Sequence, residues 1–109
     1  MKNNTINSKK YFESFSNKNL DELKEMYDDN IILKDWNGVW EGKKEVLIMN
    51  NNLFQDIKSL KVNIKQIHQI LNRTYCHIDI EIDNTKLDVI DVIDWTENFK
   101  ISKIEAFKG

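Results

Sequence analysis

The chain has 109 residues, the length of one small domain, so we expect residues 1–109 to form a single unit around one core. A net charge of −2, with both signs interspersed along the chain, argues against a nucleic-acid groove and against binding to an anionic membrane. The single cysteine, Cys76, excludes an internal disulfide and leaves the cytoplasm as the default location, and no run of 18 apolar residues predicts a membrane span.

Two amphipathic helices are expected at the start of the chain. Ser8 is placed to cap the first, whose apolar face repeats at i, i+3 and i+4 and consists of Tyr11, Phe12 and Phe15. Asn19 and Glu22 have the spacing of a capping box, which predicts a second helix that ends at 28–30. The apolar positions of this second helix are Leu20, Leu23, Met26 and Tyr27.

A small hairpin and a third helix are expected next. Residues 31–36 have the composition of a strand, and Asn37-Gly38 is a strong two-residue hairpin signal before a short return strand at 39–40. Gly42 then opens a helix with five apolar positions, Val46, Leu47, Met49, Leu53 and Phe54.

The second half of the chain is predicted to be a four-stranded meander. Alternating apolar and polar residues indicate strands at 60–65 and 76–82, followed by a long strand at 85–95 and a last strand at 99–107. The resulting layout is α+β, with three N-terminal helices on the concave face of a curved antiparallel sheet.

Asp91 is the least expected residue of this pattern. It lies in the apolar run 87–93, and its strand parity places it with Val89 and Ile93 rather than with the solvent-facing set. An aspartate on a buried face is costly unless it is protonated or paired. The sequence therefore predicts a protonated or hydrogen-bonded carboxyl group at this position.

This order of elements resembles the nuclear-transport-factor-2-like superfamily, in particular its SnoaL-like and ketosteroid-isomerase-like branch. The resemblance covers nearly the whole chain and rests on four segments at matching spacing, 11–15, 19–30, 38–43 and 89–104. It implies a cone-shaped half-barrel that is open at one end and is commonly a homodimer formed through the sheet.

The resemblance also implies catalytic roles. Tyr11 falls on the isomerases' oxyanion-hole tyrosine, Asp35 on their general base and Asp91 on their second oxyanion-hole acid, while Tyr27 matches a tyrosine that supports the first. Two departures stand out: Asn50 replaces a frequent supporting tyrosine, and Trp36 follows the base where proline is common. The bulky indole is expected to reshape or shrink the pocket.

The function expected is binding of a small apolar carbonyl compound, with proton transfer of the isomerase or lyase type as the chemistry and no cofactor. The alternative is a non-catalytic ligand-binding or dimerisation module, because a fold does not fix a function. Each catalytic candidate also has a structural alternative: a core tyrosine for Tyr11, a turn aspartate for Asp35 and a structural hydrogen bond for Asp91. We expect an apolar pocket lined by Phe12, Phe15, Tyr27, Trp36, Leu47, Val89 and Trp95.

His77, Asp79 and Glu81 share one face of the strand 76–82 and so could imitate a metal site. Alternate positions on one strand rarely converge on one ion, and no other His or Cys cluster supports a metal. A solvated or dimer-facing stripe is the favoured interpretation, and we expect no metal.

Overall fold

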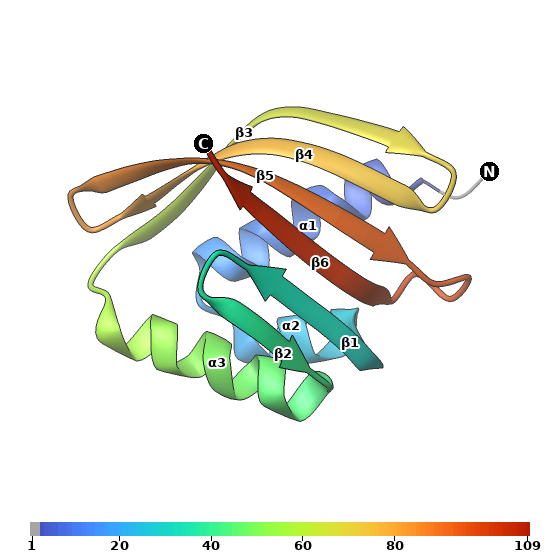
Figure 1. Cartoon of the computed structure of the whole chain (residues 1–109), viewed down its shortest axis with the longest axis horizontal. Helices are drawn as coiled ribbons and strands as arrows, with labels where there is room; N and C mark the ends of the chain where they lie inside the picture. Colours follow the sequence, from blue (N-terminus) through green and yellow to red (C-terminus); the bar gives the residue numbers. More distant parts are fainter. Residues whose placement is uncertain (1–2) are drawn as a thin grey trace.

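The structure is a computed structural model that describes residues 3–109. Three helices and six strands follow one another along the chain (Figure 1). The elements are α1 (Asn4–Ser16), α2 (Leu20–Met26), β1 (Tyr27–Asp35), β2 (Gly38–Glu41), α3 (Lys43–Asp56), β3 (Leu60–Ile70), β4 (Arg73–Ile82), β5 (Thr85–Trp95) and β6 (Ile101–Lys108). The expected α+β layout is confirmed.

The six strands form one sheet in the order β2-β1-β6-β5-β4-β3. Neighbouring strands are antiparallel except β1 and β6, which pair in parallel and align Leu33 with Ile104. The expectation of a wholly antiparallel sheet is therefore wrong at this one junction. The reason is topological: α3 carries the chain from the β2 edge to the β3 edge, and the meander then returns to meet β1 from the other side.

The three helices lie on one side of the sheet, and the sheet curves around them (Figure 1). α1 packs on β3 and β4, whereas α3 packs on β1 and β2. Irregular register within β3, between Ile64 and Gln66, and on β5, between Asp94 and Trp95, adds local bending of the strands. The curvature leaves room between the helices and the middle of the sheet.

The helix caps agree only in part with the sequence prediction. Asn3, not Ser8, caps α1, because its side-chain oxygen accepts the backbone N–H groups of Thr5 and Ile6. Ser8 lies inside the helix, where its hydroxyl donates to the Asn4 carbonyl. The Asn19 cap of α2 is confirmed by its bond from the Glu22 amide.

Several strand ends differ from those expected. The bend at 28–30, predicted as a helix end, is already part of β1, and β3 extends five residues beyond 65 to Ile70. The hairpin turn consists of Trp36 and Asn37, because Asp35 pairs directly with Gly38. β5 has the predicted bounds, 85–95.

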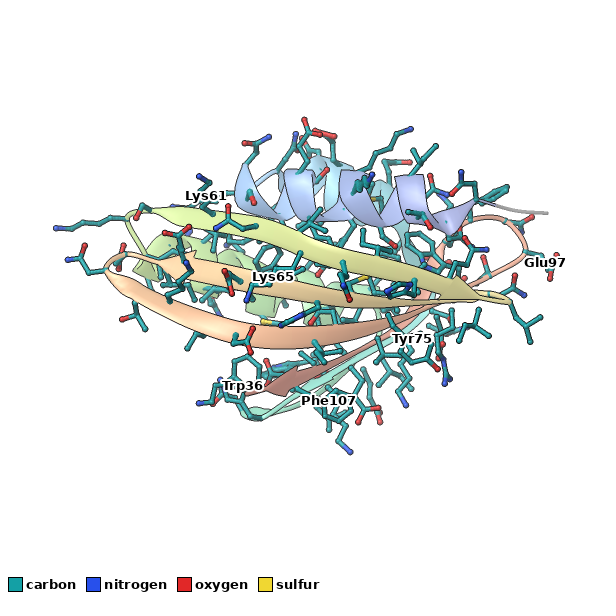
Figure 2. All side chains as sticks on the ribbon, turned by 90° about the horizontal axis from the view of Figure 1, so that it is seen from above. Trp36, Lys61, Lys65, Tyr75, Glu97 and Phe107 are labelled. Atoms are coloured by element: carbon teal, nitrogen blue, oxygen red, sulfur yellow. The ribbon has the colours of Figure 1, made fainter. Side chains whose placement is uncertain are left out.

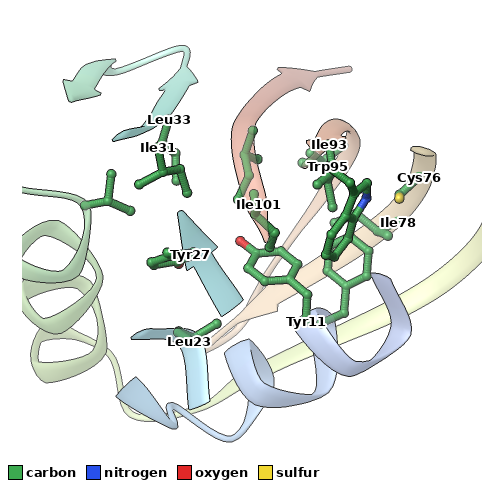
Figure 3. Packing of buried hydrophobic residues seen from close by; sticks show 14 of the residues in the cluster. Tyr11, Leu23, Tyr27, Ile31, Leu33, Cys76, Ile78, Ile93, Trp95 and Ile101 are labelled. Atoms are coloured by element: carbon green, nitrogen blue, oxygen red, sulfur yellow. The ribbon is translucent and has the colours of Figure 1, made fainter. Parts of the chain in front are cut away.

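The hydrophobic core lies between the three helices and the concave face of the sheet (Figure 3). Tyr11, Tyr27, Ile93 and Trp95 are among its members, and each is at most 4% exposed. Within residues 3–109, no helix is long and apolar enough to cross a membrane.

Candidate functional site

A partly enclosed cavity of about 360 Å³ opens between the concave face of the sheet and the helices α1 and α3. Its wall is largely apolar, and the polar groups that reach it are few. Exposed Trp36 and Asn37, in the turn between β1 and β2, lie at its mouth. The lining residues are Tyr11, Phe15, Leu33, Asp35, Trp36, Asn37, Trp40, Met49, Asn50, Leu53, Ile80, Ile82, Leu87, Asp91, Ile104 and Ala106.

All three catalytic candidates reach this cavity, although they come from separate elements. Tyr11 is on α1, Asp35 ends β1 and Asp91 is in the middle of β5. The volume lies near the lower end of the range of about 300–1,000 Å³ found for ligand pockets. The tertiary structure therefore brings a phenol and two carboxyl groups to one small, largely apolar space.

Asp91 points inward, as its strand parity predicts, and only 6% of it is exposed. Its direct neighbours across the sheet are Cys76 on β4 and Ala106 on β6, whose small side chains leave space above the carboxyl group. Burial, and then the negative charge of Asp35, raise the pKa of Asp91 to about 7. At and below neutral pH a large share of Asp91 is therefore a neutral acid that can donate a hydrogen bond.

Tyr11 lies on the buried face of α1, against the rings of Phe12 and Phe15 at centroid distances of 5.1 and 6.1 Å. Burial, and then the neighbouring Tyr27 and Asp91, raise its pKa well above the ordinary value of a tyrosine. The hydroxyl therefore stays protonated and is a donor at the cavity wall. Figure 3 shows Tyr11 and Tyr27 in the same buried cluster.

Tyr11, Tyr27 and Asn50 form a buried polar series. The Tyr27 hydroxyl donates to Asn50 Oδ1 at 2.7 Å. Burial raises the pKa of Tyr27, whereas the neighbouring hydroxyl of Tyr11 lowers it, so the two phenols lie close together. A ligand oxygen that takes the proton of Tyr11 therefore has the Tyr27 oxygen as a nearby competitor.

Asp35 differs from Asp91 in its surroundings, because it is only half-buried. One of its carboxylate oxygens accepts the backbone N–H of Asn37 at 2.6 Å, which is an Asx-type turn. Asp35 thus combines the turn role that the sequence allows with a position on the cavity wall. This arrangement leaves its second oxygen available at the mouth.

Five of the residues expected to line the pocket lie elsewhere, and only Phe15 and Trp36 take part in the lining. The others pack within the core or, in the case of Leu47, against it, instead of reaching the cavity. Trp95 is four residues along β5 from Asp91, about 13 Å for an extended strand, and its indole N–H donates to Thr74 at 3.0 Å. The displaced residues are Phe12, Tyr27, Leu47, Val89 and Trp95.

No family model and no curated protein matches the sequence. Solved structures do match it. A candidate SnoaL-like polyketide cyclase from Shewanella putrefaciens superposes with a TM-score of 0.88 at 11% identity, over 99% of this chain and 90% of that one. A candidate ketosteroid isomerase from Kribbella flavida gives 0.81 at 10% identity, over 94% and 74%. Nuclear transport factor 2 from Cryptosporidium parvum gives 0.80 at 16% identity, over 96% and 90%.

The chain has the nuclear-transport-factor-2-like fold. The resemblance drawn from the sequence is therefore confirmed at the level of the fold. Sequence identities of 10–16% show a shared fold and do not show a shared function. In this fold the concave face of the sheet, the mid-part of α1 and one face of α3 surround the cavity.

Besides Asn37 at the mouth, Asn50 is a polar residue of the nuclear-transport-factor-2-like cavity that was not predicted to line it. It is fully buried on α3, on the face that also carries Val46 and Met49. A polar residue on the apolar face of a helix is a signal that could have identified it. Trp40 and Leu53 also line the cavity without having been predicted.

The charged stripe on β4 lies on the opposite side of the sheet. His77 Nε2 lies 2.7 Å from Asp88, and Lys65 lies 3.0 Å from Asp79 and 3.4 Å from Asp88. In residues 3–109, no cluster of His, Cys, Asp or Glu has an arrangement that could hold a metal ion. The stripe belongs to a network of hydrogen bonds and ion pairs at the outer surface, where Figure 2 shows Lys65.

Proposed function

We propose that the protein binds a small, largely apolar carbonyl compound in the cavity and moves a proton on it without a cofactor, as an isomerase or lyase does. One observation supports this proposal most. A buried tyrosine and a carboxyl group with a pKa of about 7 reach the same apolar cavity as a half-buried carboxylate. Two hydrogen-bond donors, Tyr11 and Asp91, and a proton acceptor, Asp35, within one small cavity are an arrangement that favours proton transfer.

In the proposed reaction, Tyr11 and neutral Asp91 donate hydrogen bonds to the carbonyl oxygen. Asp35 removes a proton from the carbon next to that carbonyl, and the negative charge that develops moves onto the oxygen. Fixed donors aimed at such an oxygen supply about 3–4 kcal/mol each in well-studied sites. Asp35 then returns the proton to another carbon for isomerisation, or a leaving group departs for elimination.

The cavity favours a small ligand. Its volume of about 360 Å³ and the indole of Trp36 at its mouth leave little room for a large fused-ring compound. The names of the structural neighbours, a polyketide cyclase and a ketosteroid isomerase, agree with a carbonyl ligand, although this chain would take a shorter one.

The second candidate function is a ligand-binding module without catalysis. It is favoured by the bond from the Asn37 amide to Asp35, because a turn role alone would account for an aspartate at that position. In that case Tyr11 and Asp91 bind a ligand oxygen and no proton is transferred.

Binding of phenols, which mimic an enol or enolate, tests the proposal. We expect wild-type protein to bind substituted phenols, and Tyr11→Phe and Asp91→Asn each to weaken that binding about tenfold or more, because each removes or weakens one donor to the oxygen. Tyr75→Phe, which removes a tyrosine hydroxyl on the outer face of the sheet, is the matched control for Tyr11→Phe. Wild-type protein that binds no phenol, or variants that bind as well as wild type, would contradict the oxyanion-hole assignment.

We also propose a homodimer formed through the outer face of the sheet. Ile90 on β5 and Phe107 on β6 are direct register partners there, and they are 44% and 50% exposed. Phe107 and Tyr75 lie on the side of the sheet away from α1 (Figure 2). A stable interface on this face should bury at least about 1,000 Å². Sedimentation at micromolar concentration should give a dimer that Phe107→Lys converts to monomer, and a wild-type monomer would overturn the proposal.

A further inference from the structure

The two ends of the Asn50 side-chain amide have unequal partners. Its oxygen accepts the Tyr27 hydroxyl at 2.7 Å. Its nitrogen, in contrast, has only the thioether of Met49 as an acceptor, at 4.0 Å. A thioether sulfur is a weak acceptor, so the N–H groups of Asn50 are nearly unsatisfied by residues 3–109.

Asn50 is fully buried, and its side chain belongs to the cavity wall. A buried amide donor without a strong acceptor is costly, and in native structures such a group usually has a ligand or water as its partner. The lining around it is mainly aliphatic and aromatic, with Met49 and Leu53 as its neighbours on α3. An acceptor brought in by a ligand would satisfy the amide.

Asn50 approaches the cavity from a different wall than Asp91 does. α3 packs under β1 and β2, whereas Asp91 is on β5, which β6 separates from β1 (Figure 1). Tyr27, which donates to Asn50, is also a neighbour of Tyr11, so the amide lies near the proposed oxyanion site without being part of it. A ligand oxygen held by Tyr11 and Asp91 therefore leaves a second polar position across the cavity.

We propose that Asn50 Nδ2 binds a second oxygen of the ligand, so that the preferred substrates are carbonyl compounds with a further ketone, ester or hydroxyl oxygen a few atoms away. This inference rests on the proposed function, because it takes the first oxygen to lie at Tyr11 and Asp91. A site with a buried donor discriminates strongly against analogues that lack the matching acceptor. Asn50 is thus a specificity-determining residue, and it takes no part in moving the proton.

The test compares phenols of equal shape that differ in one acceptor. The first pair of probes is 4-hydroxyacetophenone and 4-isopropylphenol, in which the carbonyl oxygen of the acetyl compound takes the place of one methyl group of the isopropyl compound. The second pair consists of their 3-substituted isomers. The proteins are wild type, Asn50→Leu and the control Asn52→Leu, which alters an exposed position of the same helix. Because the two phenols differ in acidity, the quantity of interest is the ratio of their dissociation constants in each protein.

In at least one isomer series, we expect the preference of wild-type protein for the acetyl compound over the isopropyl compound to be about 3- to 10-fold greater than the preference of Asn50→Leu. Asn52→Leu should keep the wild-type ratio. Equal ratios in wild type and Asn50→Leu, for both isomer series, would overturn the role of Asn50. If wild-type protein binds none of the phenols, the proposed function itself fails, which is a different result.

A second measurement needs no variant. In ¹⁵N-labelled wild-type protein, the assigned side-chain NH₂ signal of Asn50 should shift strongly with the acetyl phenol and only weakly with the isopropyl phenol. Equal shifts with saturating amounts of both probes would contradict a hydrogen bond from Nδ2 to the ligand, whether or not Asn50→Leu folds.

Discussion

Asp35 and Asp91 line the same cavity, and the negative charge of Asp35 is one of the two causes that raise the pKa of Asp91. The larger cause is burial: Asp91 is only 6% exposed, whereas Asp35 is half-buried. Two aspartates thus have different surroundings within one site. The difference allows a neutral acid and a carboxylate to coexist near pH 7.

Asp91 should make the stability of the protein depend on pH. Its pKa of about 7 in the folded state lies above the unfolded value of about 3.9, so the folded chain holds the proton more tightly. The contribution of the protonated form is fully present below pH 4, is lost as pH rises through 7, and amounts to at most about 4 kcal/mol. Asp91→Asn should remove this slope and leave stability at pH 7–8 equal or higher, as measured by urea unfolding at several pH values. A wild-type free energy of unfolding with the same pH slope as the variant would count against the raised pKa.

Asp35→Asn should separate binding from turnover. The asparagine keeps a side-chain oxygen for the Asn37 amide, so the turn should persist, whereas the proton acceptor is lost. We expect phenol affinity within about threefold of wild type, and proton exchange at the α-carbon of a bound ketone reduced at least 100-fold. Deuterium incorporation followed by NMR measures the exchange. Undiminished exchange in the variant would exclude Asp35 as the base.

The same Asp35→Asn variant should also lower the pKa of Asp91, because a negative charge at the cavity is removed. Burial remains, so the value should stay above the ordinary range of an aspartate. The carboxyl ¹³C shift of Asp91, titrated in both proteins, measures the change. An unchanged or raised pKa in the variant would mean that the two carboxyl groups are not coupled.

Tyr27→Phe tests which way the proton of Tyr11 points. The change leaves Asn50 Oδ1 without its donor, so it should destabilise the fold by about 1–3 kcal/mol. Phenol affinity should hold or rise, because the Tyr11 hydroxyl no longer has a competing acceptor. A tenfold loss of affinity would instead mean that Tyr27 supports Tyr11, as its counterpart does in the isomerases that the sequence resembles.

Trp36→Ala should widen the mouth of the cavity. The indole is 41% exposed, and the Lys108 ammonium lies 5.3 Å from its ring centre. We therefore expect little change in stability, about 1 kcal/mol or less, and a gain in affinity for naphthols relative to phenols. If the ratio of naphthol to phenol affinity is the same as in wild type, Trp36 does not limit the size of the ligand.

The sequence by itself determined the order of elements, the inward direction of Asp91 and the Asn19 cap of α2, whereas the cap of α1 and the position of the hairpin turn differ from the prediction. Period-two alternation fixes which strand residues share a face, so Asp91 could be assigned to the buried side with Val89 and Ile93. The Asn19 cap and the bounds of β5 follow from equally local patterns.

Only the tertiary structure decided the parallel pairing of β1 with β6, the composition of the cavity wall and the partners of Asn50. Val89 has the same strand parity as Asp91 yet lies in the core, where it is buried and does not line the cavity. Which inward residue reaches a cavity depends on the packing of helices distant in sequence, and local periodicity carries no information about that packing. The physical reason is that a strand pattern sets the direction of a side chain, whereas the helix packed above it determines whether a void remains there.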